Sequence, residues 1–162
     1  MDALENWHEY NVAMLGATAA LAGLVIVAAS VNIQVVITAA SLTSRVASGI
    51  AGLILASIVC AVGLFPDLTI TAYGAVVVGA AALTTVFAAV AAVRIFQNHH
   101  PENRLRAGKA AVAFVTPLLY AAGGIIALTG SGGGLVWLAV GAIAAIVSAL
   151  FVSWVVLVEV LR

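Results

Sequence analysis

Five uninterrupted apolar runs, each of about 20 residues or more, divide the sequence, and short polar segments separate them. A helix of about 20 residues rises about 30 Å, which matches the hydrocarbon thickness of a bilayer. Backbone groups in lipid must be paired within their own segment or in a closed barrel, and the runs lack the alternation of barrel strands. We therefore predict an all-α, polytopic membrane helical bundle with five transmembrane helices. The expected spans are about residues 10–33, 46–65, 73–96, 110–129 and 135–158.

The composition excludes several classes of protein. Of the 162 residues, 65% are hydrophobic and 7% are charged. In soluble domains about a quarter of all residues are charged. The segments between the runs are too short for a soluble domain, so we expect one domain over residues 1–162. The net charge is zero and basic residues do not alternate with aromatic ones, which argues against a nucleic-acid partner. The single cysteine, Cys60, excludes an intramolecular disulfide and a CxxC motif.

The positive charges indicate an orientation. Four of the six Lys and Arg residues lie in residues 94–109, which separate the third and fourth runs. If this segment is cytoplasmic, five crossings place Arg45 and Arg162 on the same side, as the positive-inside rule requires. The acidic N-terminus has no basic segment typical of a signal peptide, so the first run is expected to be a retained span. We predict a multi-pass protein of the cytoplasmic (inner) membrane, with its N-terminus outside and its C-terminus cytoplasmic.

The basic segment is expected to face lipid. Its cations are close enough to the membrane boundary to meet anionic headgroups. They are Arg94, Arg104, Arg106 and Lys109. The same segment contains His99 and His100 beside Glu102, which leaves a metal-binding or proton-sensing role open. Because no further ligands stand at a recognised spacing, we favour an ordinary solvated loop.

The N-terminal tail has an acidic face. Asp2, Glu5, His8 and Glu9 are three or four residues apart, so they share one side of a helix. In a ring of identical chains this face would attract cations at a pore mouth, or it would bind a divalent metal. The alternative, which we favour, is that Asp2 caps the helix, Glu5 completes a capping box and the tail is solvated. No cofactor is expected.

Small residues recur at steps of three or four residues in several of the runs. Such stripes allow helices in lipid to approach closely, and they are expected to mark packing faces inside the protomer rather than contacts with another chain. The stripes are Gly16, Ala20 and Gly23; Ser48, Gly52 and Ala56; and Gly141 and Ala145.

A polar cluster is predicted at the cytoplasmic ends of the first and fifth spans. Its members are Asn32, Gln34, Glu159 and Arg162. A bonded cluster would determine how the two helices dock, with Glu159 pairing with Arg162, Arg45 or Arg94.

The middles of the spans carry neutral hydroxyl groups and no ionisable side chain of the kind that proton-coupled or voltage-sensing proteins need. Pro117 is expected to kink the fourth span. We also expect no enzyme, because the sequence lacks a His-Glu-x-x-His motif, a pair of carboxylates within the spans and a base positioned for a serine nucleophile.

Both ends of the chain resemble a group of small actinobacterial membrane proteins. The similarity lies in Asn6-Trp7-His8-Glu9-Tyr10, in residues 16–24 and 30–33, and in the closing residues 154–162. Members of this group are mostly uncharacterised, and some carry the label of modulator of a membrane protease. That label implies a regulatory role but transfers no site to any residue of this chain.

We therefore expect a non-enzymatic accessory or regulatory membrane protein that packs against a larger membrane complex. The alternative is a small homo-oligomeric channel or carrier with an acidic outer mouth. The expected partners are the lipid bilayer and either another membrane protein or further copies of this chain.

Overall fold

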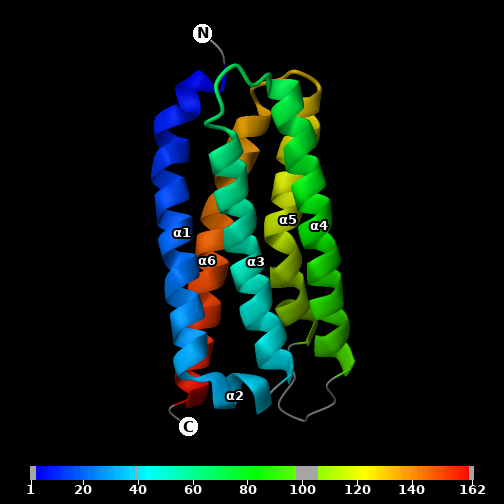
Figure 1. The fold of residues 1–162 in the computed structure, drawn as a ribbon. Coiled ribbons are helices and arrows are strands. Elements are labelled where there is room, and N and C mark those ends of the chain that lie inside the picture. Colours follow the sequence, from blue (N-terminus) through cyan, green and yellow to red (C-terminus); the bar gives the residue numbers. More distant parts are fainter. Residues whose placement is uncertain (1–2, 39, 98–105, 161–162) are drawn as a thin grey trace.

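Long helices make up the protein. The structure is a computed structural model that describes residues 3–38, 40–97 and 106–160, and no strand occurs among them. Within these ranges, five helices are long and apolar enough to cross a membrane, which confirms the predicted fold class. The long helices are α1 (His8–Val31), α3 (Ala40–Val62), α4 (Ile70–Gln97), α5 (Arg106–Leu128) and α6 (Gly134–Val160). Two short helices accompany them, η1 (Glu5–Trp7) and α2 (Ile33–Thr38) (Figure 1).

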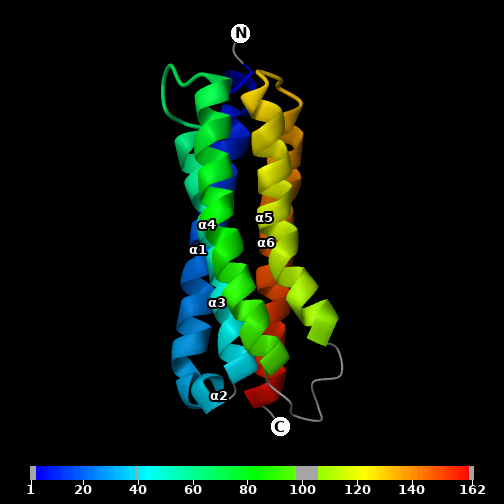
Figure 2. The same cartoon turned by 90° about the vertical axis from the view of Figure 1, so that its right-hand side faces the viewer.

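The long helices run alternately up and down. The N-terminus and the C-terminus therefore lie at opposite ends of the bundle (Figure 1). The short helix α2 lies across the same end as the C-terminus (Figure 2). We call this the α2 end and the other the N-terminal end.

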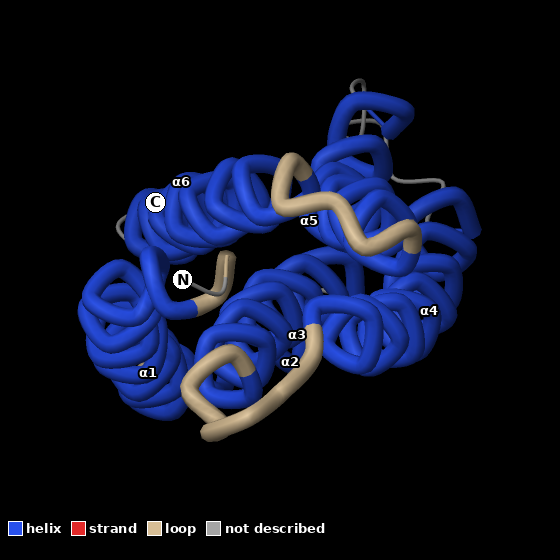
Figure 3. Tube along the Cα trace, turned by 90° about the horizontal axis from the view of Figure 1, so that it is seen from above, coloured by secondary structure: helices blue, strands red, loops and turns tan. Residues whose placement is uncertain are grey.

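The helices form two layers. Seen from the N-terminal end, α1, α3 and α4 make one row, and α6 and α5 make the other (Figure 3). The central helix is α3, which contacts each of the other four long helices, whereas α1 packs mainly against α3 and less closely against α6. In the most apolar stretch of each span, 44% of the residues are buried in α3 but only 11% in the first span. The first span is therefore the most peripheral.

The connection between the first two spans differs from the predicted loop. Residues 41–44 lie inside α3, which begins at Ala40, and α2 precedes it. The Thr43 hydroxyl donates to the carbonyl of Val36, whose side chain is buried, so α2 is fastened to the start of α3. Because residues 33–38 are themselves mostly apolar, a helical turn pairs their backbone at the membrane boundary better than an open loop would.

Glycines bring the backbones of α4, α5 and α6 together near the N-terminal end. A Cβ atom at Gly74 would lie 2.7 Å from the backbone nitrogen of Leu128 and 2.8 Å from the carbonyl oxygen of Gly124. A Cβ atom at Gly123 would lie 2.9 Å from the carbonyl oxygen of Gly134. These distances leave no room for a side chain, so this half of the bundle is closed by direct backbone contact.

The same three helices separate toward the α2 end. Pro117 lies inside α5, and the first half of α5 leans away from the bundle axis (Figure 2). A proline inside a helix lacks the backbone N–H and its ring presses on the preceding turn, which bends the helix. The kink expected at Pro117 therefore accounts for the opening between helices in this half.

Candidate functional site

A cavity of about 540 Å³ lies between α3, α4, α5 and α6. It occupies the half of the bundle between Pro117 and the α2 end, where α5 leans outward. Its lining residues come from all four helices and include Arg45, Gly52, Thr84, Thr116, Ala145 and Phe151. A volume of this size is typical of sites for small molecules.

The walls of the cavity are mostly apolar, with hydroxyl groups contributed by Ser48, Thr84, Thr116 and Ser148. The hydroxyl of Thr84 donates to the carbonyl of Ala80 at 2.9 Å, so its hydrogen is used within its own helix. The charged group that the structure places in the wall is Arg45, in the second turn of α3 and half-buried. The cavity thus combines an apolar interior with a cation near the membrane boundary.

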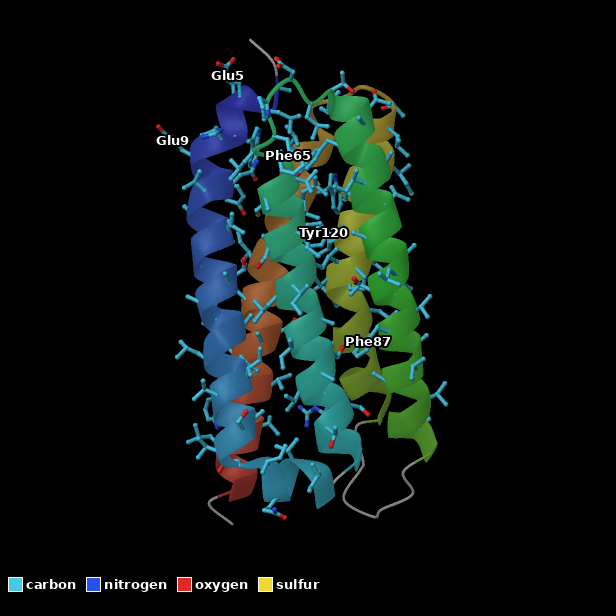
Figure 4. All side chains as sticks on the ribbon, viewed as in Figure 1. Glu5, Glu9, Phe65, Phe87 and Tyr120 are labelled. Atoms are coloured by element: carbon cyan, nitrogen blue, oxygen red, sulfur yellow. The ribbon has the colours of Figure 1, made fainter. Side chains whose placement is uncertain are left out.

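The cavity opens toward the surface that faces lipid. On α5, Val112 and Val115 line it while remaining 46% and 43% exposed. On α6, Val147 and Phe151 also line the cavity and are 46% and 64% exposed. Phe87 of α4, labelled in Figure 4, also lines the cavity and is half-exposed. Large apolar side chains therefore form the rim of the cavity.

A second interior region, near the N-terminal end, is narrow and contains several polar side chains. Tyr73 and Tyr120 are fully buried there beside Asn11 and Cys60. The hydroxyl of Tyr73 donates to the carbonyl of Val59 at 3.1 Å, whereas the hydroxyl of Tyr120 has no hydrogen-bond partner in the part of the chain that the structure describes. The space between these side chains is about 10 Å³, close to the minimum for one water molecule. This region holds helices together and has no room for an organic ligand.

Hydrogen bonds attach α1 to two neighbouring helices. The hydroxyl oxygens of Thr18 and Ser57 lie 2.9 Å apart, which connects α1 to α3. The hydroxyl of Tyr10 donates to the carbonyl of Ala139 at 3.0 Å, which connects α1 to α6. Both bonds come from one side of α1 and leave its other side facing outward.

The acidic face of the tail lies at the N-terminal end. Glu5, His8 and Glu9 are all exposed, and the carboxylates of Glu5 and Glu9 point away from the bundle (Figure 4). Asp2 lies outside the described residues. Among the described residues, no group of three or more His, Cys, Asp or Glu is placed to hold a metal ion.

The capping box expected for the tail is described only in part. The helical segment begins at Glu5 with Leu4 in the N-cap position, and the Leu4 cap has no side-chain hydrogen bond. Residues 3 and 4 form a turn. Because Asp2 lies outside the described residues, its capping box with Glu5 stays a prediction.

The basic segment connects two helices at the α2 end. Arg94 belongs to the last turns of α4, and Arg106 and Lys109 to the first turn of α5. The side chains of these three residues, like Arg104 and the His99–His100 pair, lie outside what the structure describes. Their places along the helices put them at the same end of the bundle as Arg45.

The predicted inner-end cluster is described only in part. Asn32 is the C-cap of α1, and its amide nitrogen donates to the Ala28 carbonyl at 3.0 Å, within its own helix. Gln34 is exposed on α2. The side chain of Glu159 and the whole of Arg162 lie outside the described residues, so a bonded cluster between the first and last spans stays a prediction.

Two of the three small-residue stripes face the interior. On α3, Gly52 and Ala56 are buried and Ser48 is half-buried, and a Cβ atom at Gly52 would contact the Thr116 side chain at 3.7 Å. On α6, Ala145 is buried. The neighbouring Gly141 is also buried, and a Cβ atom there would lie 3.1 Å from the ring of Tyr120.

The stripe on α1 faces away from the bundle. Gly16, Ala20 and Gly23 are exposed, and nothing lies within 4 Å of a Cβ atom built at either glycine. The prediction that this stripe packs against another helix of the same protomer is therefore wrong. The bonds of Thr18 and Tyr10 to neighbouring helices turn the opposite side of α1 inward.

This outward stripe belongs to a longer seam. Steps of four and three residues alternate along it, which is the spacing that keeps side chains on one side of a helix over several turns. All its members are exposed: Glu9, Ala13, Gly16, Ala20, Gly23, Val27 and Ser30. We call this set the α1 seam. The spacing of the seam is visible in the sequence, but the stripe predicted there, Gly16, Ala20 and Gly23, is only its middle part.

Comparison with protein-family models, with curated proteins and with solved structures finds no match to this chain. What the protein does is therefore inferred from its own geometry.

Proposed function

We propose that the chain is a non-enzymatic accessory or regulatory protein of the cytoplasmic membrane, and that α1 packs against a helix of a larger membrane complex. The observation that supports this proposal is the α1 seam, which is exposed along the whole helix. Glycine and alanine on one face allow two helix backbones to approach, and the close van der Waals contact drives association in lipid.

The attachment of α1 suits this role. Thr18 and Tyr10 hold one side of the helix against α3 and α6. The seam lies on the other side, on the least buried of the five spans. A partner helix would therefore meet a surface that is already ordered, which lowers the entropic cost of binding.

The orientation belongs to the same proposal. The α2 end carries Arg45, the basic segment and the chain end before Arg162. Glu5, Glu9 and Asp67 lie at the N-terminal end or in its connections, and Glu159 belongs to the last turn of α6 at the α2 end. Under the positive-inside rule the α2 end faces the cytoplasm and the N-terminus faces outward.

Site-specific photo-crosslinking in native membranes tests the packing of α1. A crosslinking residue at Ala13 or Val27 of the seam is expected to capture one different membrane protein in stoichiometric amount. The matched control is Leu83, which is 75% exposed on α4 and should give no such product. The double variant Gly16→Leu, Gly23→Leu should abolish the product without changing the helix content. Equal capture from Leu83 and the seam would contradict the proposal.

A homo-oligomeric channel or carrier is the second candidate, and the place of Glu9 favours it. Glu9 precedes Gly16 by seven residues and belongs to the α1 seam. Copies that pack along their seams would gather Glu9, and Glu5 near it, at the N-terminal end. Backbone contact at Gly74 closes this half of each bundle, so an ion path would run between copies.

Reconstitution separates this candidate from the first. A channel of identical chains should give self-crosslinks from the seam and cation flux in liposomes. Glu5→Gln and Glu9→Gln should reduce that flux. Self-crosslinking with flux would overturn the accessory proposal, whereas monomeric chains without flux would overturn the channel.

A further inference from the structure

We propose that the cavity between α3, α4, α5 and α6 binds one acyl chain of an anionic phospholipid from the leaflet at the α2 end, with the lipid phosphate at Arg45. This site does not depend on the packing of α1, because no residue of α1 lines the cavity.

The depth of the cavity matches one leaflet. Along α3 its lining runs from Arg45 to Gly52, and along α6 from Ala144 to Val152, which at about 1.5 Å per residue is about 10 to 12 Å. The hydrocarbon of one leaflet is about 15 Å deep, half of about 30 Å. The cavity therefore begins near the headgroup boundary and ends near the middle of the membrane.

The interior and the rim suit a hydrocarbon chain. The side chains that border the opening are Val112, Val115, Val147 and Phe151, which all face the lipid side of α5 and α6. An apolar cavity of this kind does not hold water stably, because water would lose hydrogen bonds there. An acyl chain can enter sideways from the leaflet without crossing a polar barrier.

The far end of the cavity excludes a transmembrane helix as the occupant. A spanning helix would need a groove along the whole membrane thickness. The lining of the cavity ends at Pro117 on α5. One turn further along α5, Tyr120 is fully buried, and its ring lies 3.1 Å from the position of a Cβ atom at Gly141 of α6. The groove thus closes near the middle of the membrane, where a lipid tail also ends.

Arg45 gives the site its preference for an anionic headgroup. It lines the cavity at the α2 end, and its guanidinium has five N–H donors. Several donors allow one group to keep a contact within the protein and also bind a phosphate oxygen. The sequence places Arg106 and Lys109 in the first turn of α5 at the same end, which adds to the positive potential there.

Electron spin resonance of the full chain in phosphatidylcholine bilayers tests the site. The probes are phosphatidylglycerol and phosphatidylcholine with the same chains, each carrying a nitroxide far down one acyl chain. We expect a motionally restricted component with about a fivefold preference for phosphatidylglycerol, the effect of about one basic group at the membrane surface. Arg45→Gln should remove the preference, and Arg45→Lys should retain most of it. Equal restricted fractions for the two lipids in the wild type would overturn the proposal.

A matched pair of variants on α5 tests whether the chain enters the cavity. Ala113 lines the cavity, whereas Ala111 is exposed and does not. Ala113→Phe should fill the space and remove the extra restricted component for both lipids, and Ala111→Phe should leave it unchanged. Ala144→Leu fills the space from α6 and replaces Ala113→Phe if that variant loses its helix content. A folded filling variant with an unchanged restricted component would also overturn the proposal.

Discussion

The hydroxyl oxygens of Thr18 and Ser57 lie 2.9 Å apart and connect α1 to α3. Each oxygen is also close to a carbonyl one turn back in its own helix, Met14 at 2.7 Å and Leu53 at 2.9 Å. Each hydroxyl has a single hydrogen, so one donates across the interface while the other donates within its helix. Because Thr18 is fully buried, this bond is shielded and gives the peripheral helix a fixed position.

The first prediction concerns this pair. A double-mutant cycle with Thr18→Ala and Ser57→Ala should give a coupling free energy of about 0.6 kcal/mol, and no more than about 1.7 kcal/mol, as for other hydroxyl bonds between membrane helices. The measurement is unfolding in mixed micelles of rising SDS content, followed by circular dichroism. The control is Thr84→Ala combined with Ser57→Ala, since Thr84 donates within its own helix, and its coupling should be zero. Equal coupling in both cycles would disprove the interhelical bond.

The second prediction separates the two buried tyrosines. Tyr73→Phe removes the bond to Val59 and should lower the free energy of unfolding by about 1 kcal/mol. Tyr120→Phe removes a hydroxyl without a partner among the described residues, so it should leave stability unchanged or raise it by about 1 kcal/mol. The same SDS titration measures both. A larger loss from Tyr120→Phe than from Tyr73→Phe would show that the Tyr120 hydroxyl is bonded in the membrane.

The third prediction tests the backbone contact between α4 and α5. Gly74→Ala would place a methyl group 2.7 Å from the nitrogen of Leu128, and the overpacking should cost about 1 to 3 kcal/mol. Gly79 lies on the same helix with nothing within 4 Å of a Cβ atom. Gly79→Ala should therefore be neutral or stabilise by up to about 1 kcal/mol, because alanine favours the helix. Similar losses for the two variants would mean that α4 and α5 do not touch at Gly74.

The fourth prediction tests the orientation by cysteine labelling. Cys60 is buried, and Cys60→Ala provides a background without thiols. Ser131→Cys, in the exposed connection before α6, should react with a membrane-impermeant maleimide in intact cells. Gln34→Cys on α2 should react only after the membrane is permeabilised. Labelling of both sites from the same side would contradict the three crossings expected between Gln34 and Ser131. Labelling of Gln34→Cys in intact cells, with Ser131→Cys protected, would mean that the proposed orientation is inverted.

Much of the fold is visible in the sequence. The lengths of the apolar runs predicted the five spans to within a few residues at most boundaries, because the bilayer thickness fixes how long a spanning helix must be. The largest departure is α3, which begins at Ala40 rather than near residue 46. The helix α3 extends beyond its apolar run into the polar residues at the membrane boundary, and hydropathy cannot locate the end of a helix among polar residues.

The candidate sites were less predictable. Stripes of small residues looked alike on α1, α3 and α6, yet Gly52 and Gly141 face neighbouring helices while Gly16 faces outward. The cavity depends on the bend at Pro117 together with glycine contacts at the other end of α5. The proline was recognised, but the paired glycines of the fourth span, Gly123 and Gly124, were a signal that the sequence reasoning passed over.

Hydropathy and charge thus establish how many helices are long and apolar enough to cross a membrane and which residues gather at each end, because water and hydrocarbon differ so strongly in their affinity for polar groups. They do not distinguish a side chain in the interior from one that faces lipid, since lipid tails are as apolar as leucine. Which face of α1 is free, and where α5 leaves room for a ligand, follow from shape: the contacts of glycine backbones, one kinked helix and a few hydrogen bonds.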